Sequence, residues 1–248
     1  MRLNRLLYLA LLTAMTLSAV SCGKEDSAQH YMQRGMALYD DGDIVKARLE
    51  FKNVLQVDPK DADAWFMLAQ VAEQQQEWRD AFSSYAQTVE LAPDNHEARV
   101  KLGMLLLAGN KPDEALAEAD AVLAAAPQDP AALALRGSVR LRQGDAEAAL
   151  ADAQAALAQA PGHRQALALL ADIRLKQEDF PAAKEALEAA VQANPDDIAM
   201  TLALAGVSDR MGDSARATAI LREVVEREPA ELAHRTRRSE ERRVGKEC

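Results

Sequence analysis

The sequence predicts an all-α fold built from stacked helical hairpins, and three observations support that prediction. The 248-residue chain is 49% apolar, 27% charged and only 4% aromatic, and its apolar content comes mainly from Ala and Leu, which favour helices. Six of its nine prolines recur at intervals of 34 residues. Small residues recur at the same interval within each period, and a fixed period of this length is typical of repeat proteins.

The period holds along most of the chain. The six prolines are Pro59, Pro93, Pro127, Pro161, Pro195 and Pro229. An alanine lies twelve residues before each proline, at Ala47, Ala81, Ala115, Ala149, Ala183 and Ala217. Twelve residues earlier again stand Gly35, Ala69, Gly103, Gly137, Ala171 and Ala205. Because proline ends a helix and small residues let two helices cross closely, each period predicts a pair of helices.

The first element, residues 1–21, has the pattern of a bacterial export signal. Two arginines precede an uncharged run over 6–20, which is shorter than the roughly 20 apolar residues of a membrane span. The run closes with Ala19-Val20-Ser21-Cys22, which resembles the lipobox of bacterial lipoproteins. That resemblance implies cleavage before Cys22 and attachment of acyl chains to it, which together anchor a protein stably. A plain signal peptide with an incidental cysteine, or an uncleaved anchor, is the alternative.

The next element, residues 22–27, is then a lipidated tether. Gly23 follows Cys22, and in Gram-negative lipoproteins of this pattern a residue other than aspartate at this place implies sorting to the outer membrane, on its periplasmic face. The covalent lipid on Cys22 is the only non-protein group that we expect, with no cofactor.

The repeats occupy residues 28–229. Their boundaries are 28–61, 62–95, 96–129, 130–163, 164–197 and 198–229. Large side chains recur in the first helix of a pair at Tyr31, Trp65, Leu133 and Leu167, and in the second at Phe51, Tyr85, Leu187 and Leu221. The residues expected to cap the first helices are Asp61, Asn95, Asp129 and Asp197. The turns within a pair are predicted at Gly42-Asp43, Gly144-Asp145 and Gly212-Asp213, and Pro181 is predicted at a helix start.

This arrangement resembles the tetratricopeptide repeat (TPR), a 34-residue helix-turn-helix family with small residues in the same two places and a closing proline. The resemblance implies an α-solenoid, a right-handed superhelix with the first helices on its concave face. Arg99 and Thr201 depart from it where the second repeat has Trp65, and Ala119 and Ala153 replace the aromatic of the second helix. The Ala-rich stretch 115–160 is therefore expected to open first.

The last elements lie beyond the sixth repeat. Residues 230–237 have the pattern of the start of a truncated seventh repeat. Residues 238–248, RSEERRVGKEC, fit neither the period nor the composition, and they resemble a translated sequencing adapter. We interpret this tail as non-native, so that Cys248 is not a site; a solvated basic tail is the alternative.

Charge and motif content exclude several classes of function. The net charge is −10 although both ends are basic, which argues against a nucleic-acid partner, because phosphates need clustered Lys and Arg. The histidines are scattered over different repeats, at His30, His96, His163 and His234. They have no partners at metal-ligand spacing, and the chain has neither a Gly-rich phosphate loop nor a nucleophile elbow. We therefore expect no enzyme, no catalytic residue, no metal and no small-molecule substrate.

The resemblance implies that certain first-helix residues face a partner-binding groove. In the N-terminal half these are Met32, Met36, Tyr39, Phe66, Gln70, Val100, Met104 and Leu107. With the acidic groove residues Asp40, Asp63 and Glu73, this apolar, Met-bearing set favours an amphipathic helix or extended segment with basic and apolar side chains. A carboxylate clamp is not expected, because Met32 and Met36 stand where it needs Lys and Asn. Ordinary packing between helices is the alternative reading of the same stripe.

The predicted function is a membrane-anchored periplasmic scaffold or adaptor that binds protein or peptide partners in an envelope assembly or export complex. Lipoproteins of this build occur in outer-membrane assembly, pilus biogenesis, and exopolysaccharide or sorting-signal (PEP-CTERM) export. Fold alone does not choose among these systems. The alternative is a docking arm of a larger enzyme or transport component whose functional domain lies beyond about residue 235.

Overall fold

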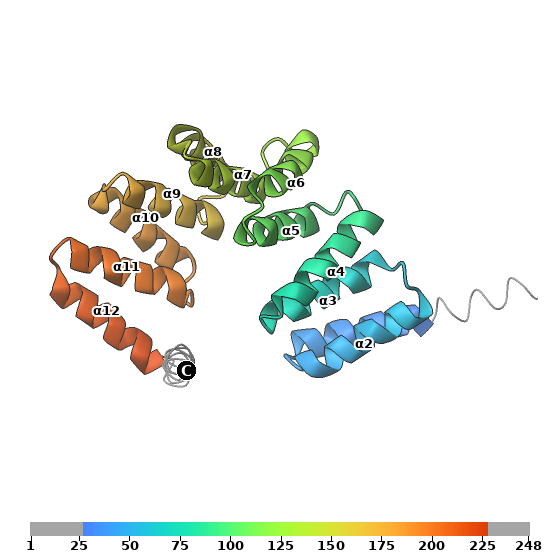
Figure 1. Ribbon diagram of the computed structural model, residues 1–248. Coiled ribbons are helices and arrows are strands. Elements are labelled where there is room, and N and C mark those ends of the chain that lie inside the picture. Colours follow the sequence, from blue (N-terminus) through green and yellow to red (C-terminus); the bar gives the residue numbers. More distant parts are fainter. Residues whose placement is uncertain (1–26, 228–248) are drawn as a thin grey trace, which may run out of the picture. The chain divides into compact units, whose positions relative to one another are not determined.

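The computed structural model describes residues 27–227, and these residues form helices and turns without a strand (Figure 1), which confirms the all-α prediction. Residues 27–40 form the first described helix. The helices that follow are α2 (Ile44–Val57), α3 (Ala62–Gln74), α4 (Trp78–Leu91), α5 (His96–Ala108), α6 (Pro112–Ala125), α7 (Pro130–Gln143), α8 (Ala146–Gln159), α9 (Arg164–Lys176), α10 (Phe180–Ala193), α11 (Ile198–Arg210) and α12 (Ser214–Arg227).

Helix contacts divide the chain into two compact units, Met1–Asn110 (unit 1) and Lys111–Cys248 (unit 2). The described part of unit 1 holds the helix at 27–40 and α2 to α5, and that of unit 2 holds α6 to α12. Within each unit, helices that follow one another in the chain pack side by side as hairpins. The boundary between the units falls between the two helices of the third predicted repeat.

The helix starts follow the predicted capping pattern. The side chains of Asp61, Asn95 and Asp129 accept the backbone N–H three residues later at 2.8–2.9 Å, and Asp197 does so from Met200 at 3.2 Å. In α9 the same place is taken by His163, whose Nδ1 accepts the N–H of Ala166 at 3.3 Å. The sequence does not predict this role for His163, because histidine is not among the preferred N-cap residues.

The turn within each hairpin uses one left-handed backbone position. Gly42, Gly144 and Gly212 adopt φ of 79°, 93° and 82°, which confirms the three predicted turns, because glycine enters this region without steric cost. The same position 34 residues apart is occupied by Gln76, Asn110 and Glu178, with φ of 59–61°. The turn geometry is therefore retained in hairpins that lack the glycine.

The small residues of the period lie where helices approach most closely. A Cβ on Gly35 would lie 2.5 Å from the ring of Phe51 in α2, and a Cβ on Gly137 would lie 2.5 Å from Cδ2 of Leu169 in α9. Phe51 and Tyr85 are fully buried, as predicted for the large residues of the second helix. Leu221, predicted to pack in the same way, is instead 45% exposed, because no described helix follows α12 to cover it.

Arg99 keeps the polar contact of the residue that it replaces. The indole Nε1 of Trp65 donates to the carbonyl of Pro59 at 3.0 Å, and Nε of Arg99 donates to the carbonyl of Pro93 at 2.7 Å. Both bonds join the first helix of one repeat to the closing proline of the repeat before it. The departure from the pattern thus retains the bond between successive repeats.

Several predictions concern segments outside the described residues. These are the signal at 1–21, the lipid site Cys22, the start of a seventh repeat at 230–237 and the tail at 238–248. Over residues 27–227, no helix combines the length and the apolar character that crossing a bilayer requires.

Candidate functional site

The eight predicted groove residues all lie in unit 1. Met32, Met36 and Tyr39 come from the helix at 27–40. Phe66 and Gln70 come from α3, and α5 supplies Val100, Met104 and Leu107. The predicted set thus lies on three helices of unit 1, each of which is the first helix of its repeat.

Burial separates these eight residues into accessible and packed members. Met36 is 48% exposed, whereas Val100 is only 6% exposed and belongs to the interior. Met32 and Tyr39 are half-buried against the core cluster that contains Phe51. Phe66, Gln70, Met104 and Leu107 are also half-buried. The stripe therefore serves partly as core and partly as surface, and both readings of its spacing apply.

Glu73, near the end of α3, organises the polar part of this face. Its Oε2 accepts the hydroxyl of Tyr85 at 2.7 Å. The ammonium of Lys101 lies 2.8 Å from Oε1 and 3.0 Å from Oε2 of the same carboxylate. One half-buried carboxylate is thus held from two sides, by a tyrosine of α4 and a lysine of α5.

The same cluster fixes two aromatic rings. Phe66 meets Tyr85 edge-on, with ring centroids 6.0 Å apart and planes inclined by 61°, a favoured geometry for aromatic pairs. Burial raises the pKa of Tyr85, and the bond to Glu73 and that residue's charge raise it further, so the phenol remains a protonated donor. Burial, with the charges of Glu73 and Asp40, also raises the pKa of Tyr39. We call Met36, Tyr39, Phe66, Gln70 and Glu73 the first-helix face.

Sequence reasoning missed the pair between Glu73 and Lys101. The two residues occupy the twelfth position of the second repeat and the sixth position of the third, on the first helices of consecutive repeats. First helices of consecutive repeats are neighbours in a solenoid of this kind. A register comparison of opposite charges at these two positions would have found the pair.

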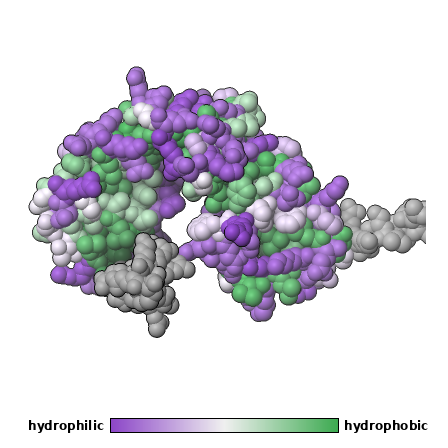
Figure 2. All heavy atoms as spheres, in the orientation of Figure 1, coloured by the Kyte–Doolittle hydropathy of each residue, from purple (hydrophilic) through white to green (hydrophobic). Residues whose placement is uncertain are grey.

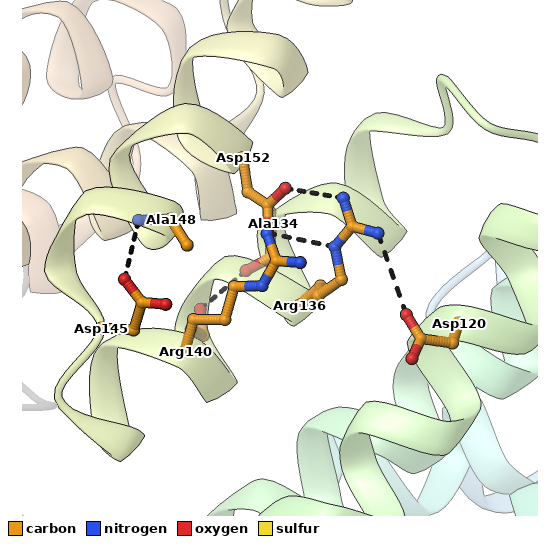
Figure 3. A network of polar contacts seen from close by, with 8 residues as sticks. Asp120, Ala134, Arg136, Arg140, Asp145, Ala148 and Asp152 are labelled. Atoms are coloured by element: carbon orange, nitrogen blue, oxygen red, sulfur yellow. Dashed lines mark hydrogen bonds and ion pairs between the residues drawn. The ribbon is translucent and has the colours of Figure 1, made fainter.

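A second polar cluster lies in unit 2, around Asp152 of α8 (Figure 3). Arg136 donates to both carboxylate oxygens, Nε to Oδ2 at 3.1 Å and Nη2 to Oδ1 at 2.7 Å. Arg140 donates from Nη1 to Oδ2 at 2.8 Å. The Asp152 side chain is 5% exposed. Charged groups at such depth need partners of this kind, and hydrogen bonding to Asp152, opposed by burial, raises the pKa of Arg136.

The cluster of unit 2 has a register equivalent in unit 1. Arg34 and Glu50 lie three periods before Arg136 and Asp152, and Arg34 Nη2 contacts Glu50 Oε1 at 2.5 Å. The second, third, fifth and sixth repeats have leucine in place of the arginine, at Leu68, Leu102, Leu170 and Leu204. Only the first and fourth repeats combine an arginine at this place with an acid sixteen residues later, since the third has Glu118 but Leu102, and this combination was the sequence signal for the bridge.

These clusters are suited to holding shape, and no metal set accompanies them. Over residues 27–227, no group of three or more His, Cys, Asp or Glu side chains is arranged to hold a metal ion. Of the four histidines, His163 is committed to its helix cap, and His234 lies outside the described residues.

Comparison with family models places tetratricopeptide repeats along most of the chain. One model of the tetratricopeptide repeat matches residues 32–96, and a second matches residues 72–139, 140–200 and 174–238. Together these matches cover well over half of the chain.

Comparison with individual proteins gives more distant similarities. A DnaJ homolog subfamily C member 7 homolog of Schizosaccharomyces pombe is 31% identical over 107 residues, a match that covers 37% of this chain and 22% of that protein. The chain thus matches about a fifth of the length of that relative. Among solved structures, the type IV pilus biogenesis factor PilW is 21% identical with a TM-score of 0.66, over 82% of this chain and 94% of that one. Pseudomonas aeruginosa PilF is 18% identical with a TM-score of 0.61, over 88% and 99%. At these identities the solved structures show the shared fold.

Proposed function

The chain belongs to the tetratricopeptide-repeat family, and on this premise we propose that it is a lipid-anchored scaffold of the bacterial cell envelope whose first-helix face in unit 1 binds a peptide segment of a partner. Repeats of this family serve protein–protein interaction, and the coarse role of scaffold follows from the family. The anchor, the envelope location and the binding face are our proposal.

The observation that carries the binding face is its accessible apolar surface beside a fixed polar cluster. Met36 is exposed, and half-buried Tyr39 and Phe66 lie near Glu73. Because Tyr85 and Lys101 hold the Glu73 carboxylate, its charge is already largely compensated. The carboxylate of Asp40 remains exposed at the end of the helix at 27–40, which also carries Met36.

This distribution supports a particular kind of partner. The flexible Met36 side chain adapts to varied apolar surfaces, and the aromatic rings, fixed by their contacts, offer rigid ones. A basic side chain in the partner would meet Asp40. The face therefore suits an amphipathic helix or extended segment with apolar anchors and one or more Lys or Arg.

Two solved structures support the choice of setting. PilW is described as a type IV pilus biogenesis factor, and PilF has the same fold. The likeness is one of fold and does not carry their roles over by itself. It agrees, however, with the envelope setting expected from the lipobox around Cys22.

The binding face is tested by site-specific photocrosslinking in the native host. A photoreactive amino acid at Met36 should capture one partner reproducibly, and the same group at Glu185, exposed on α10 of unit 2, should not capture it. Met36→Glu should abolish co-purification of that partner while the circular dichroism stays unchanged. Equal capture from both positions would contradict the proposed face.

The anchor is tested separately, because the chain has only two cysteines. Cells fed a palmitate analogue should label the protein, Cys22→Ser should remove the label, and Cys248→Ser should leave it. Label that survives Cys22→Ser would contradict the proposed anchor.

A further inference from the structure

The outer side of unit 1 carries an apolar patch that neither the core nor the first-helix face uses. Val45 and Leu49 of α2 are 72% and 58% exposed, and Trp78 and Phe82 of α4 are 53% and 37% exposed. Each pair is spaced by four residues, so each lies on one face of its helix. We call these four residues the outer patch.

One polar contact links the two helices that carry the outer patch. Arg48, next to Leu49, donates from Nη1 to Oε1 of Glu77 at 3.3 Å and also contacts Gln75. Glu77 directly precedes Trp78 at the start of α4. The ion pair therefore joins α2 to the start of α4 beside the exposed side chains.

The α2 half of the outer patch also differs in charge from the corresponding helix of unit 2. Helix α2 carries three basic residues and one acidic residue, whereas α6 carries four acidic residues and no basic one. Lys52 and Arg79 are exposed near the patch, and neither forms an ion pair within residues 27–227. At the places of Val45 and Leu49, two periods later in the chain, α6 has Asp113 and Ala117.

We propose that the outer patch lies against the surface of an anionic phospholipid bilayer. Exposed Trp, Phe and Leu with interspersed Lys and Arg are the composition that inserts at a membrane interface and is drawn to anionic headgroups. Figure 2 shows hydrophobic and hydrophilic residues interleaved over unit 1.

The position of the lipid site supports the same occupant, and this step rests on the proposed function. Five peptide steps separate Cys22 from Ser27, where the described helix begins, and a fully extended chain of that length spans at most about 18 Å. Helix α2, with 14 residues, is about 21 Å long. A lipid on Cys22 would thus hold Ser27, at the start of the first described helix of unit 1, within one helix length of the bilayer.

The two tryptophans of the chain make the proposal testable on the full-length protein. Trp78 belongs to the outer patch, while half-buried Trp65 is bonded to the carbonyl of Pro59. Trp65→Phe leaves Trp78 as the reporter, and Trp78→Phe leaves Trp65 as the matched control. Both proteins are purified with their native lipid state, checked by mass, and mixed with phosphatidylethanolamine–phosphatidylglycerol vesicles that contain brominated acyl chains.

We expect brominated lipid to quench roughly half of the Trp78 emission and to leave Trp65 nearly unchanged. Val45→Glu with Leu49→Glu should abolish the quenching of Trp78, and omission of phosphatidylglycerol should weaken it. A lipidated protein whose Trp78 is not quenched would overturn the inference and leave the anchor standing. An unlipidated protein whose Trp78 is quenched would support the outer patch and overturn the anchor. A stable dimer in solution that Leu49→Glu dissociates would assign the patch to a second copy and overturn the inference.

Discussion

The first two repeats of unit 1 and the fourth repeat, in unit 2, have the same backbone but different interiors. In the first two, the second helix contributes a fully buried aromatic ring, Phe51 or Tyr85. In the fourth, the same position is Ala153, also fully buried, and the side chains of Arg136 and Arg140 converge on Asp152 nearby. The fourth repeat thus has less apolar volume at this position, and its acid is held by two arginines where Glu50 of the first repeat is held by Arg34 alone.

The glycines at the helix crossing show the same contrast. The space above Gly35 is filled by Phe51 from the second helix of its own repeat, whereas that above Gly137 is shared by Leu169 from the next repeat and by Asp152 and Ala149 from its own. At the same repeat position, Gly35 therefore packs within its hairpin, while Gly137 packs both within its hairpin and against the next one. We infer that the fourth repeat depends more on its neighbour than the first does.

The largest expected effect concerns the Asp152 cluster of unit 2 and its equivalent in unit 1, the pair of Arg34 and Glu50. Asp152→Ala should lower the free energy of unfolding by about 3 kcal/mol, because it leaves two half-buried arginines without their carboxylate. Urea unfolding followed by circular dichroism measures the loss. Glu50→Ala is the matched change in unit 1, and because the Arg34 side chain is 54% exposed, we expect at most about 1 kcal/mol. Equal losses would remove the distinction between the units.

A smaller effect addresses the two crossings. Gly35→Ala should cost about 2 kcal/mol, because the new Cβ meets an aromatic ring that has little room to move. Gly137→Ala should cost somewhat less, because the atom in closest contact is the end of a leucine side chain, although Cβ of Asp152 at 3.1 Å and the carbonyl oxygen of Ala149 at 3.2 Å also crowd the new Cβ. Adding Phe51→Leu to Gly35→Ala should recover part of the loss. If the two alanine variants are equally unstable, the crossings do not differ as described.

The hairpin turns should respond alike in both units. Gln76→Gly in unit 1 and Glu178→Gly in unit 2 should each raise the free energy of unfolding by about 0.5–1 kcal/mol, since both positions have positive φ. Gly144→Ala should lower the free energy of unfolding, because alanine disfavours the positive φ that glycine adopts freely at this position. Thermal unfolding measures all three. A gain in one unit alone would show that the side chains, and not only the backbone, distinguish these turns.

The smallest effect concerns the histidine cap of α9. Burial lowers the pKa of His163, partly offset by the charge of Asp129, so the unfolded chain takes up its proton first as the pH falls. The cap's contribution is therefore complete above the ordinary histidine pKa of about 6.5 and declines below it. Hydrogen exchange of the Ala166 amide should accelerate, relative to the intrinsic rate, between about pH 7.5 and pH 5.5. His163→Asn, the residue used at Asn95 in unit 1, should remove that acceleration, and its persistence would contradict the role.

Local features of the fold were predictable because local chemistry sets them. The prolines fixed the ends of the second helices, Asp61 and Asn95 identified helix starts, and Gly42 and Gly144 identified turns. Each of these depends on backbone dihedral angles or on a hydrogen bond spanning a few residues. The cap role of His163 and the left-handed conformation of Gln76 were not predicted, because the neighbouring structure imposes those roles on residues that do not prefer them.

The candidate site was predictable only as a stripe. The spacing selected Met36 and Val100 alike, but helix rotation and neighbouring packing left Met36 exposed and Val100 buried. The bridge from Glu73 to Lys101 likewise depends on which helices become neighbours.

The sequence by itself determined the repeat, its helix boundaries and its family. The reason is that residues with strong backbone preferences, proline above all, recur every 34 residues and mark the same helix ends in each repeat. Only the tertiary structure decided which side chain fills each glycine crossing, which acid each arginine meets, and that the outer patch is left uncovered. Those outcomes depend on distances between segments that are far apart in the chain, and a periodic pattern does not encode such distances.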